Sequence, residues 1–193
     1  MQHDSSMADF RHETERLILR DWRKEDWPVF LKHTNTTAVM EWLGGVLPPE
    51  KHAWIEDRIT GYTRDHGFTF WVLERHDDGG HLAGEIIGFC GLKRSNQTGG
   101  PIGEHEVGWR LREDAWGKGY AKEAAMESLK LGFERYDAPH IIALTVEQNT
   151  PSWGLMKRLG MERRSDLDFH NDEFGADSII VYSITREQWE ATL

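Results

Sequence analysis

Three consecutive residues, Gly117, Lys118 and Gly119, have the composition of a phosphate-binding loop. They follow a β-type run and open an alanine-rich helical pattern, and the first backbone N–H groups of a helix have no partner within it. Glycines also let a phosphate approach the main chain without a Cβ in the way. A plain tight turn would use the same residues, so the loop alone leaves both interpretations open. A P-loop does not fit, because Tyr120 and Ala121 stand where that motif requires Lys-Ser or Lys-Thr, and the third glycine of a dinucleotide fingerprint is missing.

Two carboxylates, Glu104 and Glu106, lie in one β-type run, where strand alternation puts them on one face and His105 on the other. A carboxylate in such a position can take a proton from an amine, and it would equally suit a solvated sheet edge. The alternation disfavours a metal site built from these three residues, and no metal is expected. Cys90, the single cysteine, lies in an apolar run that predicts burial, so we do not expect it to be a nucleophile.

The hydrophobic pattern that positions these residues predicts an α+β fold. Apolar residues recur at helical spacing in 49–66 and 118–136, whereas β-rich runs are separated by short glycine turns. Thr150 is expected to cap a helix with Pro151 in its first position and Gly160 beyond its end. In chain order the expected elements are a strand (16–22), a short helix from 26, a helix (49–66), three strands (68–74, 86–93 and 104–111), a helix (118–136), a strand (140–146), the helix that begins at 150 and two strands (161–169 and 177–185). This order excludes regular Rossmann alternation and predicts a mixed, mostly antiparallel sheet of about seven strands flanked by helices.

Size and charge narrow the class of protein. The chain has 193 residues and a formal net charge of −10 at pH 7, which suits one domain (1–193, with 1–13 a flexible leader) and disfavours nucleic acid as a partner. Amines, which are cationic at neutral pH, fit the negative charge of this chain better than nucleic acid does. No apolar stretch is long enough for a membrane span, no secretion signal is visible, and one cysteine excludes an internal disulfide, so a cytoplasmic protein is expected.

Several further segments occur in a characteristic order. They are Thr14-Glu15-Arg16-Leu17-Ile18-Leu19-Arg20, Ile87-Gly88-Phe89, Glu106-Val107-Gly108-Trp109, and Asn149-Thr150-Pro151-Ser152 leading into Leu159-Gly160-Met161. With the glycine loop, they make the chain resemble the GNAT superfamily of acetyl-CoA-dependent N-acetyltransferases, and within it the RimJ/RimL type that acetylates the N-termini of ribosomal proteins. The resemblance covers most of the chain. It implies a sheet that is splayed between the fourth and fifth strands, where the cofactor lies.

The resemblance also implies which residues bind acetyl-CoA. The family's pyrophosphate pattern, Gln/Arg-x-x-Gly-x-Gly/Ala, falls on Trp116, Gly119 and Ala121, and Trp116 departs from its first position. The main chain of 109–111 would pair with the pantetheine arm, and the Asn149 amide would contact it. The full expected set is Trp109, Arg110, Leu111, Trp116, Gly117, Lys118, Gly119, Tyr120, Ala121, Asn149, Ser152 and Arg158.

By the same resemblance the acetyl group passes directly to a primary amine. Glu106 occupies the carboxylate of the family's Glu-x-Gly-aromatic strand and would act as the base. Ser152 stands where this branch places a hydroxyl near the cofactor sulfur, although a first-turn residue that bonds the backbone fits it equally. Many relatives outside this branch use a tyrosine as the acid, but no tyrosine occurs here between Tyr136 and Tyr182, which favours Ser152. Trp42 lies in the segment where relatives shape the acceptor groove.

The sequence therefore predicts an N-acetyltransferase whose acceptor is a protein N-terminus, an aminoglycoside-like antibiotic, a polyamine or a small metabolite. The alternative is a non-catalytic sensor of acyl-CoA, which would keep the glycine loop and dispense with Glu106 and Ser152. Fold resemblance does not choose the acceptor or the acyl chain. The oligomeric state stays open, and a homodimer is compatible with the sequence.

Overall fold

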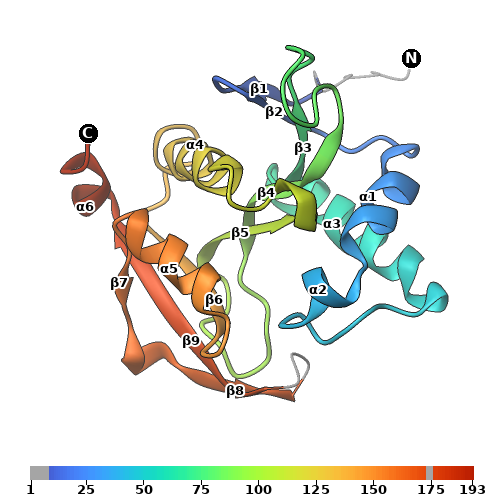
Figure 1. Cartoon of the computed structure of the whole chain (residues 1–193). Helices are drawn as coiled ribbons and strands as arrows, with labels where there is room; N and C mark the ends of the chain where they lie inside the picture. Colours follow the sequence, from blue (N-terminus) through green and yellow to red (C-terminus); the bar gives the residue numbers. More distant parts are fainter. Residues whose placement is uncertain (1–8, 173–175) are drawn as a thin grey trace, which may run out of the picture.

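One sheet runs through the molecule, and helices pack on both of its faces (Figure 1). The structure, a computed structural model, describes residues 9–172 and 176–193. Its strands are β1 (Arg11–Glu13), β2 (Leu17–Arg20), β3 (Phe70–Arg75), β4 (Ile86–Arg94), β5 (His105–Leu111), β6 (His140–Val146), β7 (Glu162–Arg163), β8 (Phe169–Asn171) and β9 (Ala176–Thr185). Its α-helices are α1 (Asp26–Thr34), α2 (Thr37–Met40), α3 (His52–His66), α4 (Tyr120–Glu134), α5 (Thr150–Arg158) and α6 (Arg186–Glu190), and 3-10 turns η1 (Pro49–Lys51), η2 (Glu113–Ala115) and η3 (Ser165–Leu167) join some of them.

The strand order is β1-β2-β3-β4-β5-β6-β9-β7, with β8 paired to β9 beside this path. β5 and β6 are the only parallel neighbours in the described part of the chain, and they share a single registered pair, Glu106 with Ile142. By contrast, β6 pairs with β9 along its full length, from His140 to Val146. Since β5 continues from Glu106 to Leu111 with registered partners on β4 alone, the two parallel strands diverge toward their carboxyl ends. The prediction of a mixed, mostly antiparallel α+β sheet, splayed between the fourth and fifth expected strands, is confirmed.

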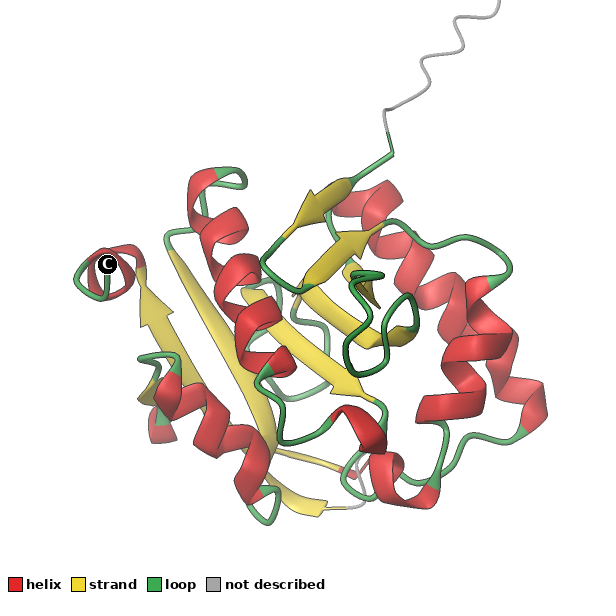
Figure 2. Ribbon diagram, turned by 45° about the horizontal axis from the view of Figure 1, so that its top comes forward, coloured by secondary structure: helices red, strands yellow, loops and turns green. Residues whose placement is uncertain are grey.

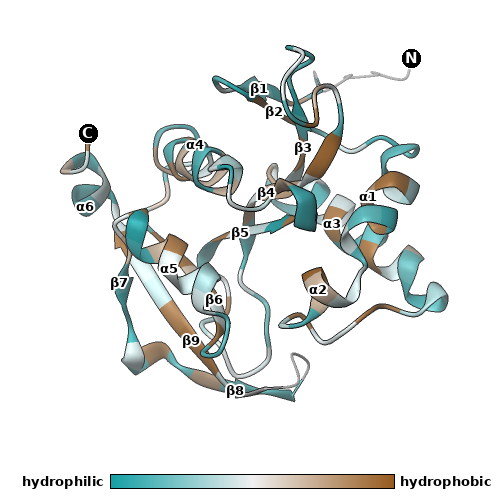
Figure 3. Ribbon diagram, viewed as in Figure 1, coloured by the Kyte–Doolittle hydropathy of each residue, from teal (hydrophilic) through white to brown (hydrophobic). Residues whose placement is uncertain are grey.

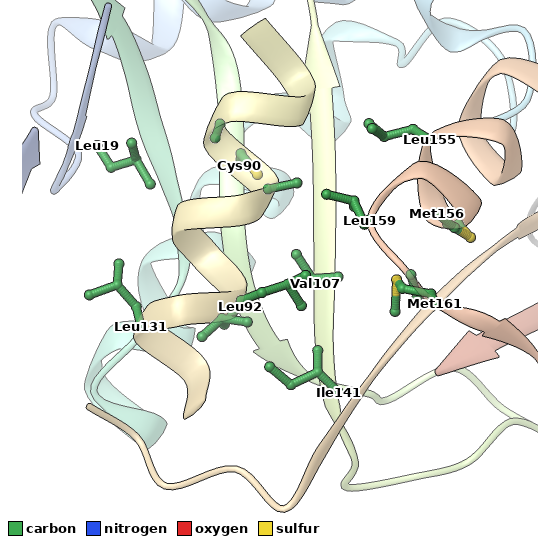
Figure 4. Close-up of a cluster of buried hydrophobic side chains, with 14 of the residues drawn as sticks. Leu19, Cys90, Leu92, Val107, Leu131, Ile141, Leu155, Met156, Leu159 and Met161 are labelled. Atoms are coloured by element: carbon green, nitrogen blue, oxygen red, sulfur yellow. The ribbon is translucent and has the colours of Figure 1, made fainter. Parts of the chain in front are cut away.

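Strand alternation sorts the core onto the two faces of this sheet. On one face, α4 and α5 cover apolar side chains of the central strands, including Leu92, Val107 and Ile141 (Figure 4). On the other face, α1 and α3 pack against β4, with Phe30 and Ile59 among the contacts. The far half of that second face carries a separate cluster, which consists of Ile142, Val146, Phe169, Ile179 and Val181. Helices therefore flank the sheet on both sides, as Figure 2 shows.

The elements that the pattern missed are short or polar. β1 is the sequence Arg-His-Glu and pairs with β2, so no apolar alternation marks it; residues 1–8 of the predicted leader lie outside the described residues. The expected strand 161–169 is interrupted by η3 and becomes β7 and β8. Asn149, rather than Thr150, is the N-cap residue of α5. Hydrophobic residues gather on strands such as β3 and β9 in Figure 3, and no helix in the described ranges is long and apolar enough to cross a membrane.

Candidate active site

The glycine loop begins α4 with a backbone that favours glycine. Gly119 is the N-cap of α4 with φ +81°, and Gly117 has φ +70°, both in the left-handed region that strains other residues. A Cβ built on Gly117 would meet no atom within 4 Å, so this part of the loop faces open space. The first N–H groups of α4 point out of the same end of the helix. These features fit a pyrophosphate, and exposed Lys118 and Lys122 add positive charge.

Residues from the amino-terminal segment hold this loop in place. Arg16 donates from Nη1 to the carbonyl oxygen of Lys118 at 2.9 Å and from Nε to Glu123 Oε2 at 2.7 Å. Thr14 Oγ1 donates to Glu123 Oε1 at 2.7 Å, and the Arg16 guanidinium lies 4.6 Å from the centre of the Tyr120 ring. Burial acts to raise the pKa of Glu123, but the hydrogen bonds from Thr14 and Arg16 outweigh it and hold that pKa below its usual value. We call Thr14, Arg16 and Glu123 the loop brace. Sequence reasoning used Thr14 and Arg16 only as family markers and missed Glu123.

The aromatic residues of the loop bond to their own chain. Trp116, which is 48% exposed, donates from Nε1 to the carbonyl oxygen of Leu111 at 3.0 Å. Tyr120 is buried, and its hydroxyl donates to the carbonyl oxygen of His81 at 3.3 Å. Ala121 is partly buried against the core on the α4 face. Within the loop, the groups that remain open to a phosphate are therefore the backbone amides and the lysines.

One edge of β5 is open beside the loop. Trp109, Arg110 and Leu111 are registered with Cys90, Phe89 and Gly88 of β4, and the described part of β6 supplies no registered partner to them. An extended molecule with amide groups can pair with such an edge as an added strand would. Because β5 and β6 are parallel, the segments that follow them leave the sheet at the same edge. The topology thus brings the glycine loop, after β5, and Asn149, after β6, to the two sides of the splay.

The start of α5 provides polar groups at the β6 side of the splay. Asn149 donates from Nδ2 to Thr145 Oγ1 at 3.1 Å. The partly buried Ser152 has its N–H bonded to the Asn149 carbonyl oxygen at 3.1 Å, and its hydroxyl makes no hydrogen bond within the described residues. The hydroxyl is therefore not used to bond the backbone. Arg158 lies at the opposite end of α5, exposed, and its guanidinium lies near Gly154.

Glu106 is buried on the face of the sheet that α3 covers. Its side chain is 7% exposed, and Lys93 Nζ lies 3.6 Å from its Oε2. The same Oε2 is buried without a hydrogen-bond partner among the described residues. Burial raises the pKa of Glu106, although the charge of Lys93 acts in the opposite direction. A carboxylate with a raised pKa and a free oxygen is a better proton acceptor than a solvated one.

The residues next to Glu106 have other roles. Glu104 precedes β5 and bonds to His140 Nε2 at 2.5 Å, with its side chain 39% exposed; that it shares a strand face with Glu106 stays a prediction. His105 is buried near the Phe68 ring, where burial and the charge of Arg94 lower its pKa to about 4. In the described ranges, no group of three or more metal-ligating side chains occurs.

Trp42 lies on the same face of the sheet as Glu106. It contacts the apolar cluster that contains Ile142, and registered neighbours such as Glu106 and Ile142 point to the same face. Two surface hollows lie along α1, one of which reaches Glu113 and Asp114 just before the glycine loop.

Cys90 is fully buried, and burial raises its pKa to about 12, which makes a thiolate nucleophile unfavourable.

Comparisons with known proteins agree with this geometry. Residues 16–162 match the family model described as acetyltransferase (GNAT) domain. The chain is 31% identical over 153 residues to the uncharacterized N-acetyltransferase YnaD of Bacillus subtilis (strain 168), across 78% of this chain and 81% of that protein. The fold is similar to that of an acetyltransferase from Agrobacterium tumefaciens str. C58, with a TM-score of 0.78, 22% identity, and 96% of this chain and 100% of that one covered. It is also similar to the spermidine N-acetyltransferase of Vibrio cholerae in complex with CoA and spermine, with a TM-score of 0.69, 16% identity and coverage of 92% and 99%. The chain therefore belongs to the GNAT family of acetyltransferases.

Proposed function

We propose that this acetyltransferase passes the acetyl group of acetyl-CoA directly to a primary amine. The observation that carries the proposal is the splay: the open edge of β5 lies between the glycine loop and the start of α5. The backbone amides of Gly117, Gly119 and the first turn of α4 would hold the pyrophosphate. The main chain of 109–111 and the Asn149 amide would hold the pantetheine arm. Acetyl-CoA supplies an activated thioester.

Glu106 would act as the base in this reaction. An α-amine with a pKa near 8 needs only about 1 kcal/mol to lose its proton at neutral pH, whereas a lysine amine near 10.4 needs roughly 4 to 5 kcal/mol. One buried carboxylate with a free oxygen is enough to deprotonate an α-amine, and it would still assist the deprotonation of a lysine amine. Because Glu106 lies where β5 and β6 still touch, it stands at the closed end of the splay.

Ser152 would stabilise the departing thiolate. Its hydroxyl has no hydrogen-bond partner among the described residues and belongs to the first turn of α5, on the β6 side of the splay. A free hydroxyl can donate to sulfur as negative charge develops there. Trp42 would contact the acceptor. Cys90 would stay outside the reaction.

We also infer that the chain is of the RimJ/RimL type and acts in the cytoplasm as a protein that binds no nucleic acid. The type rests on the Asn149-Thr150-Pro151-Ser152 segment, the Thr14-to-Arg20 segment and the Ser152 hydroxyl. The net charge of −10 supports the inference that the protein binds no nucleic acid, and the single cysteine supports a cytoplasmic location. The alternative of an acyl-CoA sensor predicts binding without turnover.

The proposal is tested by measuring melting temperature and thiol release together. Acetyl-CoA should raise the melting temperature, whereas ATP and NAD should not, because stabilisation follows binding to the folded state. Gly119→Val should remove most of this rise, since valine strains a backbone with φ +81° and places a branched side chain at the loop.

A matched variant, Gly45→Val, has a similar φ of +85° outside the loop and serves as the control for backbone strain. It should lower the melting temperature of the free protein and keep the rise with acetyl-CoA. Equal stabilisation by ATP, or an undiminished rise in a folded Gly119→Val protein, would remove the loop assignment. Stabilisation without thiol release for any amine would favour the sensor.

A further inference from the structure

Three cations lie on the same face of the sheet as Glu106, the face that α3 covers. Lys93 lies 3.6 Å from the Glu106 carboxylate and donates to Asn96 Oδ1 at 2.7 Å. Arg58 of α3 donates to the same Asn96 oxygen at 3.2 Å and to the Tyr62 hydroxyl at 2.7 Å. Arg110 stands four residues after Glu106 on β5 and therefore points to the same face. We call Arg58, Lys93, Glu106 and Arg110 the acceptor-side cluster.

The partly buried Arg110 has no anionic partner among the described residues, unlike the fully buried arginines of this part of the chain. Arg20 bonds to Asp26 and Glu74, and Arg112 bonds to Glu85 and Asp114. The Nε of Arg110 is buried without a hydrogen bond, and its guanidinium forms neither a hydrogen bond nor an ion pair within the described ranges. The guanidinium also lies over the Phe89 ring, 5.2 Å from the ring centre.

Arg110 is partly buried, and a buried Nε with no partner is unfavourable unless a ligand completes its hydrogen bonding. Burial and the charge of Arg58 lower the pKa of Arg110 to about 10, so it stays charged at neutral pH. The pyrophosphate does not fit as its partner. Trp109 and Leu111, the neighbours of Arg110 on β5, pack on the α4 side of the sheet, so alternation turns Arg110 away from the glycine loop.

We propose that Arg110 binds a carboxylate of the acceptor, so that the preferred substrate is an amine that also carries a carboxylate. This inference rests on the proposed function and specifies its acceptor. Glu106 and Arg110 are four residues apart, which separates their Cα atoms by roughly 13 Å. The two long side chains reach into this distance and shorten the gap that a ligand has to span. An amine at Glu106 and a carboxylate at Arg110 can therefore belong to one small molecule or to one peptide end. The three cations of the cluster against one carboxylate disfavour a polyamine.

The experiment compares each amino acid with its own carboxamide. The acceptors are unbranched amino acids with the amine and the carboxylate at opposite ends of a chain of increasing length, and dipeptides with Asp or Asn in second place. Each acid is assayed beside its amide for thiol release from acetyl-CoA. For the wild type, kcat/KM should be about tenfold higher for the best acid than for its amide, since only the acid satisfies the guanidinium. Arg110→Gln should lower kcat/KM for the acid about tenfold, change the amide within about twofold, and leave the KM for acetyl-CoA unchanged.

Two further variants make the result specific. Arg110→Lys keeps the charge and should keep part of the preference for the acid, because a single ammonium replaces the planar fork. Arg64→Gln, on the exposed part of α3, should leave both acceptors unchanged. A wild type that uses acid and amide equally, or prefers a polyamine, overturns the proposal. So does an Arg110→Gln protein that loses acetyl-CoA affinity with both acceptors.

A separate binding measurement distinguishes this proposal from the proposed function. Calorimetric titration of the same acid and amide pairs into the CoA-bound protein needs no turnover. Tighter binding of the acid that is lost in Arg110→Gln supports the carboxylate site even if no thiol is released. Equal binding of acid and amide, in a protein that does release thiol with amines, overturns the carboxylate site and leaves the acetyltransferase intact.

Discussion

At the scale of single residues, Glu106 and Ser152 divide the chemistry between the two sides of the splay. Glu106 comes from β5 and is buried beside Lys93, whereas Ser152 comes from α5 and keeps its hydroxyl free. A base acts before the new bond forms and an acid acts as the old one breaks. Variants of the two residues should therefore differ in their dependence on pH.

Glu106→Gln should lower kcat/KM by about 10²-fold at pH 7, the usual contribution of a general base. If Glu106 removes the ammonium proton, raising the pH supplies neutral amine without it, so the defect should shrink as the pH approaches the amine pKa. Ser152→Ala should lower kcat about tenfold with little change in acetyl-CoA affinity and with no such recovery. Full pH profiles of kcat/KM for one good acceptor measure the difference.

Glu104→Gln is the matched control for these profiles, because its carboxylate bonds to His140 at the start of β6. It should retain the wild-type profile. Parallel profiles for Glu106→Gln and Ser152→Ala would mean that Glu106 is structural and that water or another group takes the proton.

The sequence predicted Glu106 and Ser152 through motif positions, and the structure adds their surroundings. Lys93 lies beside Glu106 because β4 and β5 are registered with these two residues opposite each other, and register between strands is not visible in composition. The sequence also does not show that Arg110 has no anionic partner among the described residues, because this depends on which side chains the fold brings to that face.

At the scale of elements, the loop brace connects the segment before β2 to the start of α4. Arg16 bonds both to the Lys118 carbonyl oxygen and to Glu123, so it fixes the loop and the first turn of the helix together. A phosphate site formed by backbone amides depends on the loop being held in one conformation before binding.

Arg16→Met should weaken acetyl-CoA binding about tenfold without a large loss of turnover at saturation, because the brace acts on the loop and not on the reacting atoms. Arg16→Lys should recover little, since an ammonium does not reproduce the two-directional fork. Calorimetric Kd values for acetyl-CoA provide the measurement. Arg11→Met, which removes an exposed arginine paired with Glu13 on β1, should leave the Kd unchanged, and an unchanged Kd in Arg16→Met would show that the loop needs no brace.

Elements with strong periodicity were predicted closely, and short polar ones were not. The strand expected at 140–146 is β6, and the helix expected at 118–136 contains α4. In contrast, α2 and α6 have only four and five residues, too few for a helical period to emerge from a window. The start of α5 shifted by one residue because Asn149 and Thr150 are both acceptable caps.

At the scale of the whole molecule, acid stability should depend on His105. His105 is buried with a pKa of about 4, whereas the unfolded chain takes up this proton near pH 6.5. Between pH 6.5 and 4 the unfolded state binds more protons, so the free energy of unfolding falls as the pH falls through this window. The loss is on the order of 3 kcal/mol, and the group contributes almost no pH dependence above about pH 7.5.

His105→Gln should flatten this part of the profile, because glutamine does not titrate and can still accept the hydrogen bond that Arg94 donates to Nδ1 at 3.1 Å. Urea unfolding at pH 7.5 and pH 4.5 measures the effect for wild type and variant. His170→Gln, an exposed histidine near Asp172, is the control and should keep the wild-type slope. An equally steep loss in His105→Gln would assign the acid sensitivity to the carboxylates.

The single registered pair between β5 and β6 also divides the protein along its sequence. In the described part of the chain, every antiparallel pairing lies wholly within β1 to β5 or wholly within β6 to β9. The chain passes from one block to the other once, through 135–139. The first block carries the glycine loop, Glu106 and the acceptor-side cluster, whereas the second carries Asn149 and Ser152. A recombination breakpoint between 135 and 139 would leave all of these pairings unbroken. Relatives could thus exchange the block that handles the leaving thiolate while each keeps its own choice of amine.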